Sequence, residues 1–318
     1  MVSVQIIARP DPDVVSQIQR LVDDVAALEG HSPLGESKEA DLAEDGAGWS
    51  GALAYDGGRL VGYAHIRWKP SGEAPRAVVE IVVHPRWDGP TGELLLAEAQ
   101  VAVAEAGGGL LHLWAHGVAD IRDTLAARAG FNVQRELALM ERDLGAPPHQ
   151  PSLPPGVALR PFRPGRDEEA FLEVNNAAFE GHPENGGWDL AELRRRQAWD
   201  WFDPEGVIMG WRGDEPLGFH WTKRHPIAAG AAGDQGPVGE VYVLAVHPRA
   251  PRTGLGRALL LAGLAYLHRQ GCRLAILYVD RASPPAVQLY ESSGFAVAST
   301  DVCFERWVAG SASPLKRG

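Results

Sequence analysis

The chain has 318 residues, of which 45 % are apolar and 22 % are charged, and its formal net charge is −11. This length exceeds what one compact domain usually holds, and the composition is that of a folded globular protein, so disordered and collagen-like chains are excluded. No apolar run approaches the roughly 20 residues that cross a bilayer, and the N-terminus lacks a secretory signal pattern. The acidic balance argues against nucleic-acid binding, which needs a basic face.

Only two cysteines occur, Cys272 and Cys303, and the sequence has no Cys-x-x-Cys pair. We therefore expect two buried thiols in a protein of the reducing cytoplasm rather than a disulfide framework. The histidines of the second half show no metal-ligand spacing, so we expect no metal site. We expect a monomer that has no membrane or nucleic-acid partner.

Each half of the chain starts with an amphipathic helical pattern, at residues 13–28 and at residues 167–179. Short apolar runs typical of a strand meander follow, at 51–55, 59–68 and 77–84 and at 207–211, 216–223 and 240–247. The second half continues with a helix over 255–270, a strand over 274–279 and a short helix over 284–293. Each half is therefore expected to be an α+β domain, with a mixed, mostly antiparallel sheet flanked by helices.

Matches in the same order indicate a tandem duplication. Gly62-Tyr63 matches Gly218-Phe219, His84-Pro85 matches His247-Pro248, and Gly130-Phe131 matches Gly294-Phe295. A proline-rich segment without apolar periodicity separates the two halves and is typical of a stiff linker. We expect an N-terminal domain at 1–146, a linker at 147–156 and a C-terminal domain at 157–318.

The stretch from Glu240 to Arg257 predicts a loop that binds a pyrophosphate. A strand runs into a turn that contains Gly254 and Gly256, and a helix follows at once. Glycines let backbone N–H groups approach a ligand, and the helix N-terminus adds unpaired donors and a positive dipole end. Arg252 and Arg257 add full positive charge. Alone, so short a glycine motif is more often an ordinary strand–loop–helix connection.

A second motif downstream favours the pyrophosphate-binding loop over an ordinary connection. Ser283 is expected at the N-cap of a short helix and Pro284 at its first position, with Tyr290 on the helix and Gly294 at its end. In this order and spacing, the two motifs resemble the GNAT superfamily of acyl-CoA N-acyltransferases. The resemblance implies two tandem GNAT domains and acetyl-CoA as co-substrate.

Other stretches resemble one family of that superfamily, the mycothiol synthases, which are tandem GNAT proteins of about this length. This resemblance spans both halves and is denser in the second. It implies transfer of an acetyl group from acetyl-CoA to the cysteinyl amine of Cys-GlcN-Ins, which forms mycothiol. The stretches are PLGE (33–36), WAHG (114–117), VNNAAFEGHPENGGW (174–188), WFDPEG (201–206), GFHWTK (218–223), GEVYVLAVHP (239–248) and LYVD (277–280).

The resemblance implies that Glu240 is the general base and Tyr290 the general acid for the coenzyme A thiolate. A free glutamate is a weak base towards an ammonium group, so this role requires an environmental shift, a water or a relay. Without the resemblance, Glu240 is better interpreted as a solvated carboxylate and Tyr290 as a core aromatic residue. The positions that the family uses for its amino-sugar inositol substrate are Glu36, Glu184, Lys223, Glu240 and Tyr278.

The expected acetyl-CoA site combines the end of the central strand, the loop, the first turn of the long helix and the start of the short helix. Two residues depart from the superfamily pattern: Pro251 replaces a glutamine or arginine and has no N–H, and Ser283 replaces an asparagine. The site residues are Leu244, Ala245, Val246, Pro251, Arg252, Thr253, Gly254, Leu255, Gly256, Arg257, Ser283, Pro284, Pro285, Ala286, Val287 and Gln288.

The first half departs further from the pattern. Counted from the shared His-Pro, Ala77 stands where the second half has Glu240, and Asp88 and Glu93 add negative charge to the loop. Counted back from the shared Gly-Phe, Ala126 stands where Tyr290 stands. We therefore expect a degenerate, non-catalytic N-terminal domain.

Two alternatives stay open at this point. A tandem GNAT enzyme could acetylate another small amine, such as an aminoglycoside or a polyamine. A non-catalytic acyl-CoA-binding module would keep the cofactor loop without turnover. The presence of both Glu240 and Tyr290 argues against the second alternative.

Overall fold

The computed structural model describes residues 2–8, 10–29, 31–43, 48–69, 76–181, 185–225, 236–250 and 253–311. The chain divides into unit 1, Met1–Leu137 with Ser299–Gly318, and unit 2, Ala138–Ala298. The sequence instead placed the division at the proline-rich segment 147–156, which falls inside unit 2. The boundaries differ because each unit takes one strand from the other half of the chain.

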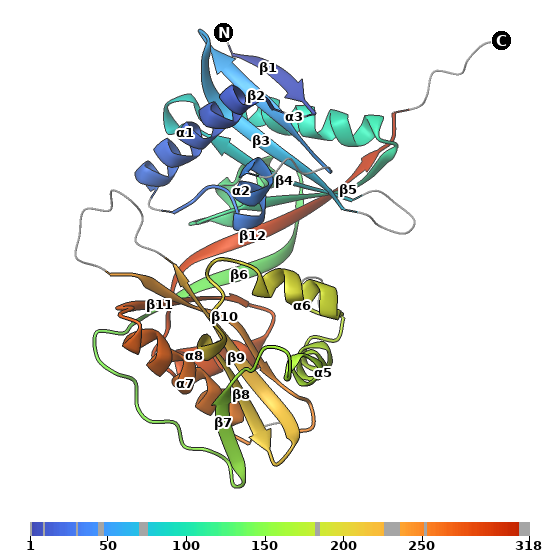
Figure 1. Ribbon diagram of the computed structural model, residues 1–318. Coiled ribbons are helices and arrows are strands. Elements are labelled where there is room, and N and C mark those ends of the chain that lie inside the picture. Colours follow the sequence, from blue (N-terminus) through green and yellow to red (C-terminus); the bar gives the residue numbers. More distant parts are fainter. Residues whose placement is uncertain are drawn as a thin grey trace, which may run out of the picture. The chain divides into compact units, whose positions relative to one another are not determined.

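Unit 1 is a six-stranded sheet in the order β1-β2-β3-β4-β5-β12 (Figure 1). β4 and β5 are parallel, whereas β1–β2, β2–β3, β3–β4 and β5–β12 are antiparallel. The late strand β12 (Ala296–Ala309) lies against β5. The other elements are β1 (Ser3–Ile7), α1 (Pro12–Glu29), α2 (Glu36–Ala43), β2 (Trp49–Asp56), β3 (Arg59–Lys69), β4 (Arg76–Val83), α3 (Pro90–Glu105), β5 (Gly108–Ala115) and α4 (Leu125–Arg128).

Helices cover both faces of the unit 1 sheet. Ile18, Val22 and Val25 of α1 pack on one face in a cluster with Leu53 and Tyr63. On the other face, α3 packs through an apolar stripe against β3, β4 and β5. The buried residues of this stripe are Leu95, Leu96, Ala99 and Val103.

Unit 2 repeats the arrangement in the order β6-β11-β10-β9-β8-β7. β10 and β11 form the parallel pair, and β9 joins β10 in an antiparallel hairpin. The unit begins within β6 (Asn132–Asp143), a strand supplied by the first half of the chain. The other elements are β7 (Val157–Pro161), α5 (Glu168–Ala178), α6 (Leu190–Gln197), β8 (Val207–Arg212), β9 (Glu215–His225), β10 (Val238–Val246), α7 (Leu255–Arg269), β11 (Leu274–Asp280) and α8 (Pro284–Glu291).

The two faces of the unit 2 sheet have separate cores. α5 and α6 cover one face through Phe171 and Leu193, which pack with Val243 and Trp221. α7 and α8 cover the other face, and a stripe of α7 is buried there, made of Leu259, Leu260, Gly263, Leu264 and Leu267. Gly263 of this stripe is needed sterically, because a Cβ would lie 2.0 Å from Nδ1 of the buried His220. The predicted α+β class, with a mixed sheet flanked by helices, is confirmed.

The duplication seen in the sequence reappears in matched contacts. Gly62 pairs with Val83 in unit 1, and Gly218 pairs with Val246 in unit 2. A Cβ at Gly62 would lie 2.9 Å from Cδ1 of Leu95, and one at Gly218 would lie 2.8 Å from Cδ1 of Leu259. In both units, therefore, the helix after the central strand approaches the sheet at a glycine.

A bulge in β10 shifts by one residue the correspondence between β10 and β4, the equivalent strand of unit 1. The register of β10 against β9 changes between Val241 and Val243, whereas β4 pairs with β3 without a shift along its described residues. Glu240 lies opposite Lys223, five residues after Gly218, and Val78 lies opposite Arg67, five residues after Gly62. The predicted match of Ala77 with Glu240 is therefore wrong, because a bulge adds one residue to a strand.

Unit 1 contains a buried charge network centred on Glu80 of β4. Its carboxylate is 1 % exposed, accepts the N–H of Gly35 at 2.7 Å and lies 2.6 Å from Nζ of Lys38. Nε2 of His116 lies 3.5 Å away, and its Nδ1 lies 2.9 Å from Asp301 of β12. Burial opposes ionisation of both groups, but these partners outweigh it and hold the pKa of Glu80 at about 2 and that of His116 at about 9.

This network predicts a pH window for stability. The contribution of His116 is full below its unfolded pKa, near 6.5, and is lost as the pH rises through about 9. The contribution of Glu80 is full above its unfolded pKa, near 4.5, and is lost as the pH falls through about 2. We expect the free energy of unfolding to fall by about 1–3 kcal/mol between pH 6.5 and 9.5. Urea unfolding followed by tryptophan fluorescence measures this decrease, and His116→Gln should flatten it. An unchanged alkaline slope in the variant would contradict the assignment.

Candidate active site

The central feature of unit 2 is a fork between its parallel strands. Within the described residues, β10 and β11 pair only from Val238–Leu274 to Glu240–Ile276. β10 then continues through its bulge to Val246, beyond the last of these described pairs with β11. Leu244, Ala245 and Val246, which were predicted to bind acetyl-CoA, lie on this extension. The arrangement suits an extended ligand that pairs with backbone groups along one strand.

Glu240 lies at the base of the fork, on the face away from α7. Its neighbour Val241 packs into the α7 core, and side chains alternate along a strand. Oε2 of Glu240 lies 2.7 Å from Nε2 of His225, the last residue of β9. Lys223 is the direct cross-strand partner of Glu240, so the same face carries all three side chains.

Aromatic rings line the surroundings of Lys223, whose side chain is buried. Its Nζ lies 5.0 Å from the ring centre of Trp201 and 5.9 Å from that of Tyr242, the residue at the bulge. The Tyr242 hydroxyl in turn accepts a hydrogen bond from Arg196 of α6. Such rings stabilise a cation that has left bulk water. Sequence reasoning did not assign Trp201, Tyr242 or Arg196 to the site.

Tyr290 belongs to the opposite face of the sheet. It packs in the core that α7 and α8 share with Leu277 and Val279 of β11, and it meets Phe295 edge to face at 5.9 Å. Burial raises its pKa to about 12, so the hydroxyl keeps its proton at neutral pH. Gly294, at φ +86°, ends α8 as predicted. The two predicted catalytic residues therefore lie on opposite faces of the sheet.

The glycine turn before α7 has the predicted geometry. Gly254 is the N-cap residue at φ +85°, in the left-handed region that glycine adopts without strain. A Cβ at Gly256 would lie 3.5 Å from Val246 and 3.7 Å from Leu289, so this glycine sits between β10 and α8. Thr253 donates a hydrogen bond to the carbonyl of Ala250. Leu255 is buried in the core below the turn.

Arg257 of the first α7 turn is tied to the end of α8. Its guanidinium donates to the carbonyl of Ser292 at 3.0 Å and to the Ser292 hydroxyl at 2.5 Å. Its charge therefore stays beside the helix N-terminus, although two of its donors are used within the protein. Pro251 and Arg252, also predicted for the loop, lie outside the described residues.

The start of α8 agrees only in part with the prediction. Ser283 is the N-cap residue and Pro284 opens the helix, but within the described part of the chain the serine side chain makes no capping hydrogen bond. Its backbone carbonyl instead accepts the N–H groups of Ala286 and Val287. Of the other predicted residues, Pro285 and Gln288 are exposed, whereas Ala286 and Val287 pack partly against the α7 core.

The three remaining substrate candidates, Tyr278, Glu36 and Glu184, lie in different parts of the chain, and the structure describes the first two. Tyr278 lies on β11, two residues beyond Ile276, and is 48 % exposed. Alternation from Ile276, the partner of Glu240, places it on the Glu240 face of the sheet. Glu36 is the first residue of α2 in unit 1. It lies between Gly35, whose N–H donates to the Glu80 carboxylate, and Lys38, which forms an ion pair with the same carboxylate. Glu184 lies outside the described residues.

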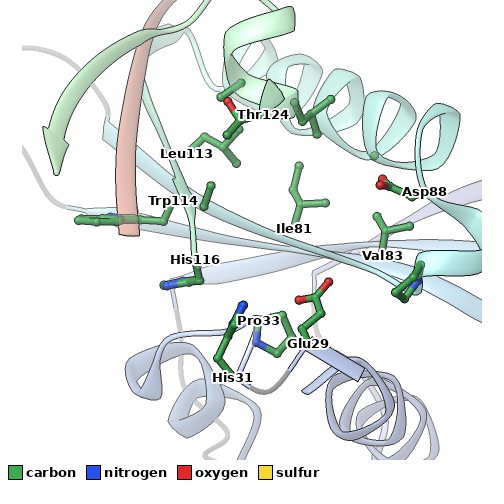
Figure 2. A pocket seen from close by; sticks show the side chains of 15 residues that line it. Glu29, His31, Pro33, Ile81, Val83, Asp88, Leu113, Trp114, His116 and Thr124 are labelled. Atoms are coloured by element: carbon green, nitrogen blue, oxygen red, sulfur yellow. The ribbon is translucent and has the colours of Figure 1, made fainter. Parts of the chain in front are cut away.

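Unit 1 has a corresponding fork that encloses a cavity of about 250 Å³. β4 and β5 stop pairing at Glu80–Trp114, and Ile81 and Val83 then line the cavity opposite Leu113 (Figure 2). Glu29 and Asp88 add carboxylates to this lining. The cavity therefore lies at a fork between two parallel strands, as in unit 2, and its border is acidic.

The residue that corresponds to Tyr290 in unit 1 is Ala126, as predicted. The N–H of Phe131 bonds to the carbonyl of Ala126, as that of Phe295 bonds to Tyr290. Gly130 has φ +75°, which matches Gly294. The helix that carries Ala126, α4, spans Leu125–Arg128, whereas α8 spans Pro284–Glu291. Ala126 is buried at the cavity wall and offers no hydroxyl there.

Comparison with known proteins agrees with this geometry. The acetyltransferase (GNAT) family model matches residues 169–295. A mycothiol acetyltransferase of Thermobispora bispora is 44 % identical over 310 residues, which cover 96 % of this chain and 100 % of the relative. One from Acidothermus cellulolyticus is 42 % identical over 305 residues, which cover 93 % of this chain and 92 % of the relative. The chain belongs to the mycothiol acetyltransferase family.

Solved structures show the same fold at lower identity. A GCN5-related N-acetyltransferase from Sphaerobacter thermophilus superposes with a TM-score of 0.73 at 22 % identity, over 98 % of this chain and 97 % of that one. A tandem GNAT protein from the clavulanic acid biosynthesis pathway also gives 0.73, at 18 % identity, over 98 % and 100 %. The expected tandem GNAT fold and N-acetyltransferase class of this mycothiol acetyltransferase family member are thereby confirmed.

Among the described residues, no helix combines the length and apolar character that spanning a bilayer requires. In the same part of the chain, no group of three or more histidine, cysteine, aspartate and glutamate side chains is arranged to hold a metal ion.

Proposed function

We propose that this acetyltransferase moves the acetyl group of acetyl-CoA to the cysteinyl amine of Cys-GlcN-Ins and so forms mycothiol. Full-length identity to mycothiol acetyltransferases, of 38–44 % in the relatives compared, carries this proposal. Glu240, Lys223 and Tyr278 on one sheet face support it, because a carboxylate, an ammonium and a phenol suit an amino sugar with many hydroxyls.

In this proposal, the acceptor amine and the departing sulfur lie on opposite faces of the sheet at the fork. Acetyl-CoA supplies an activated thioester. Leu244, Ala245 and Val246 would bind its extended arm, and the turn at Gly254 would bind its pyrophosphate. The amine then approaches from the Glu240 face, and the sulfur leaves towards Tyr290. Attack forms the C–N bond and breaks the C–S bond at the carbonyl carbon.

The two protons move on opposite sides of the fork. Glu240 takes the amine proton, directly or through a water. Tyr290 gives its hydroxyl proton to the departing thiolate, and its raised pKa ensures that the proton is present at neutral pH. Burial of Tyr290 also favours return to the neutral phenol after the transfer.

Substrate recognition is assigned to Lys223, Tyr278, Glu184 and Glu36 together with Glu240. Lys223 is buried beside Trp201 and Tyr242, so its ammonium is fixed before substrate arrives. The turn at Glu36 is held through Gly35 and Lys38 by the buried Glu80. Rigid donors and acceptors of this kind reduce the entropy lost on binding.

We assign the chemistry to unit 2 alone. Unit 1 has Val78 in place of Glu240 and Ala126 in place of Tyr290, so it lacks both the base and the acid. Glu29 and Asp88 at its cavity would oppose a pyrophosphate. Unit 1 is then a scaffold that contributes Glu36.

A direct assay tests the substrate. Purified protein with acetyl-CoA should release coenzyme A thiol and give mycothiol of the expected mass, with a higher kcat/KM for Cys-GlcN-Ins than for aminoglycosides or polyamines. Turnover on another amine alone would leave the acetyltransferase chemistry and remove the mycothiol assignment. Binding of coenzyme A without turnover on any amine would favour a binding module.

The acid and base roles predict strong effects of small substitutions. Glu240→Gln should lower kcat by about 10²–10⁴ and Tyr290→Phe by about 10–10³, because each removes one proton-transfer group. Thiol release measures both rates. Tyr266→Phe is the matched control: it removes the hydrogen bond that Tyr266 of α7 donates to Asp203 and should leave kcat unchanged. Wild-type rates in either site variant would remove that role.

The turn at Gly254 predicts a cofactor effect. Gly254→Ala strains a left-handed residue by about 1–2 kcal/mol, so the turn should shift and KM for acetyl-CoA should rise about 3- to 10-fold. Gly213→Ala, in the β8–β9 hairpin at φ +59°, carries a similar strain. This control should lose stability with an unchanged KM. Equal KM values in both variants would contradict the assignment of the turn to acetyl-CoA.

A further inference from the structure

The hydrogen bond between His225 and Glu240 has no role in the scheme above. The sequence pattern gives no reason to pair these residues, which lie on different strands. Nε2 of His225 lies 2.7 Å from Oε2 of Glu240, a short and therefore strong contact for a charge-assisted bond. Because an ionised carboxylate can only accept, His225 is the donor.

The register determines the direction of this contact. His225 pairs with Val238, two residues before Glu240 on β10. Its ring therefore approaches the carboxylate from the paired end of the fork, whereas the acetyl-CoA residues 244–246 lie towards the other end. The charged groups that the structure places on this face include Lys223 on the same strand and Glu240 itself. The Tyr242 phenol lies beside Lys223 and accepts a hydrogen bond from Arg196.

Unit 1 is an internal control for the fold. Its equivalent hairpin, β3–β4, has Val78 at the Glu240 position and Lys69 at the His225 position, where it pairs with Arg76. That hairpin forms with Lys69 and Val78 at these two positions, so its register does not need a histidine–glutamate pair there. The pair therefore occurs in the unit that also carries Tyr290, and the hairpin does not require it.

We propose that His225 is a positioning residue for Glu240, which holds the carboxylate in the rotamer that accepts the amine proton. This inference rests on the proposed role of Glu240 as base. A glutamate side chain has several free torsions, and the bond at Oε2 fixes the plane of the carboxylate group. Proton transfer depends steeply on this geometry, whereas binding of the sugar is shared between Glu240 and the other recognition residues and depends on it less.

Kinetics of His225 variants test the proposal. His225→Ala should lower kcat about 10- to 100-fold and leave both KM values within about two-fold. His225→Gln places an N–H at a similar distance from its Cβ, so it should recover much of the lost kcat. His225→Leu replaces the alanine variant if that one does not fold. The control is His268→Ala, which removes a histidine bond to the carbonyl of Leu144 and should leave kcat unchanged.

The outcomes separate this inference from the function on which it rests. A fall in kcat that glutamine reverses supports positioning. A kcat within two-fold of the wild type for His225→Ala, an equal fall in the glutamine variant, or a change in KM alone overturns it. Wild-type activity in Glu240→Gln instead removes the base assignment, and positioning with it. The combination of an inactive Glu240→Gln and a fully active His225→Ala overturns the positioning role only.

Discussion

The early end of the pairing between β10 and β11 is the constraint on which the rest of unit 2 depends. Two parallel strands whose pairing stops after Glu240–Ile276 leave a gap in the middle of a sheet. The bulge at Tyr242 increases the local twist, which is how one strand departs from its neighbour. In the proposed reaction, this gap gives access to both faces at one point, so Glu240 from one face and Tyr290 from the other would act on the same carbonyl.

Comparison of the two units distinguishes the residues that the fold requires from those that the proposed chemistry requires. Both units keep the close helix approach at Gly62 or Gly218, the fork and the Gly-Phe turn that ends the last helix. Unit 1 keeps these features without Glu240 or Tyr290 equivalents. Its central strand carries Glu80 instead, and that buried carboxylate binds Gly35 and Lys38. A buried ion pair adds little net stability, so the better-supported role for such a network is to fix one arrangement of the backbone.

Periodicity and capping signals predicted most elements of the fold, because amphipathic helices and strand meanders are local patterns. They could not predict the exchange of β6 and β12, since alternation identifies a strand but not its partner. Counting from His84-Pro85 placed Ala77 at the Glu240 position, and the bulge at Tyr242 made that count wrong by one. The glycine and Tyr290 motifs are local and could be found in the sequence, whereas His225 contacts Glu240 across two strands and Trp201 contacts Lys223 from a turn far away in sequence.

The residues on the two faces of the fork should tolerate substitution to different degrees. In the proposed reaction, the α7 and α8 face holds the thioester, which is constant, and this face is built from backbone, glycines and packed aliphatic residues. The α5 and α6 face would recognise one amine among many, and it is built from side chains: Lys223 beside aromatic rings, Arg196 on Tyr242 and the exposed Tyr278. Because backbone contacts tolerate substitution and side-chain contacts do not, selectivity for the amine should reside on the α5 and α6 face. The same division explains why a duplicated unit can lose its catalytic side chains and still keep a fork-shaped cavity.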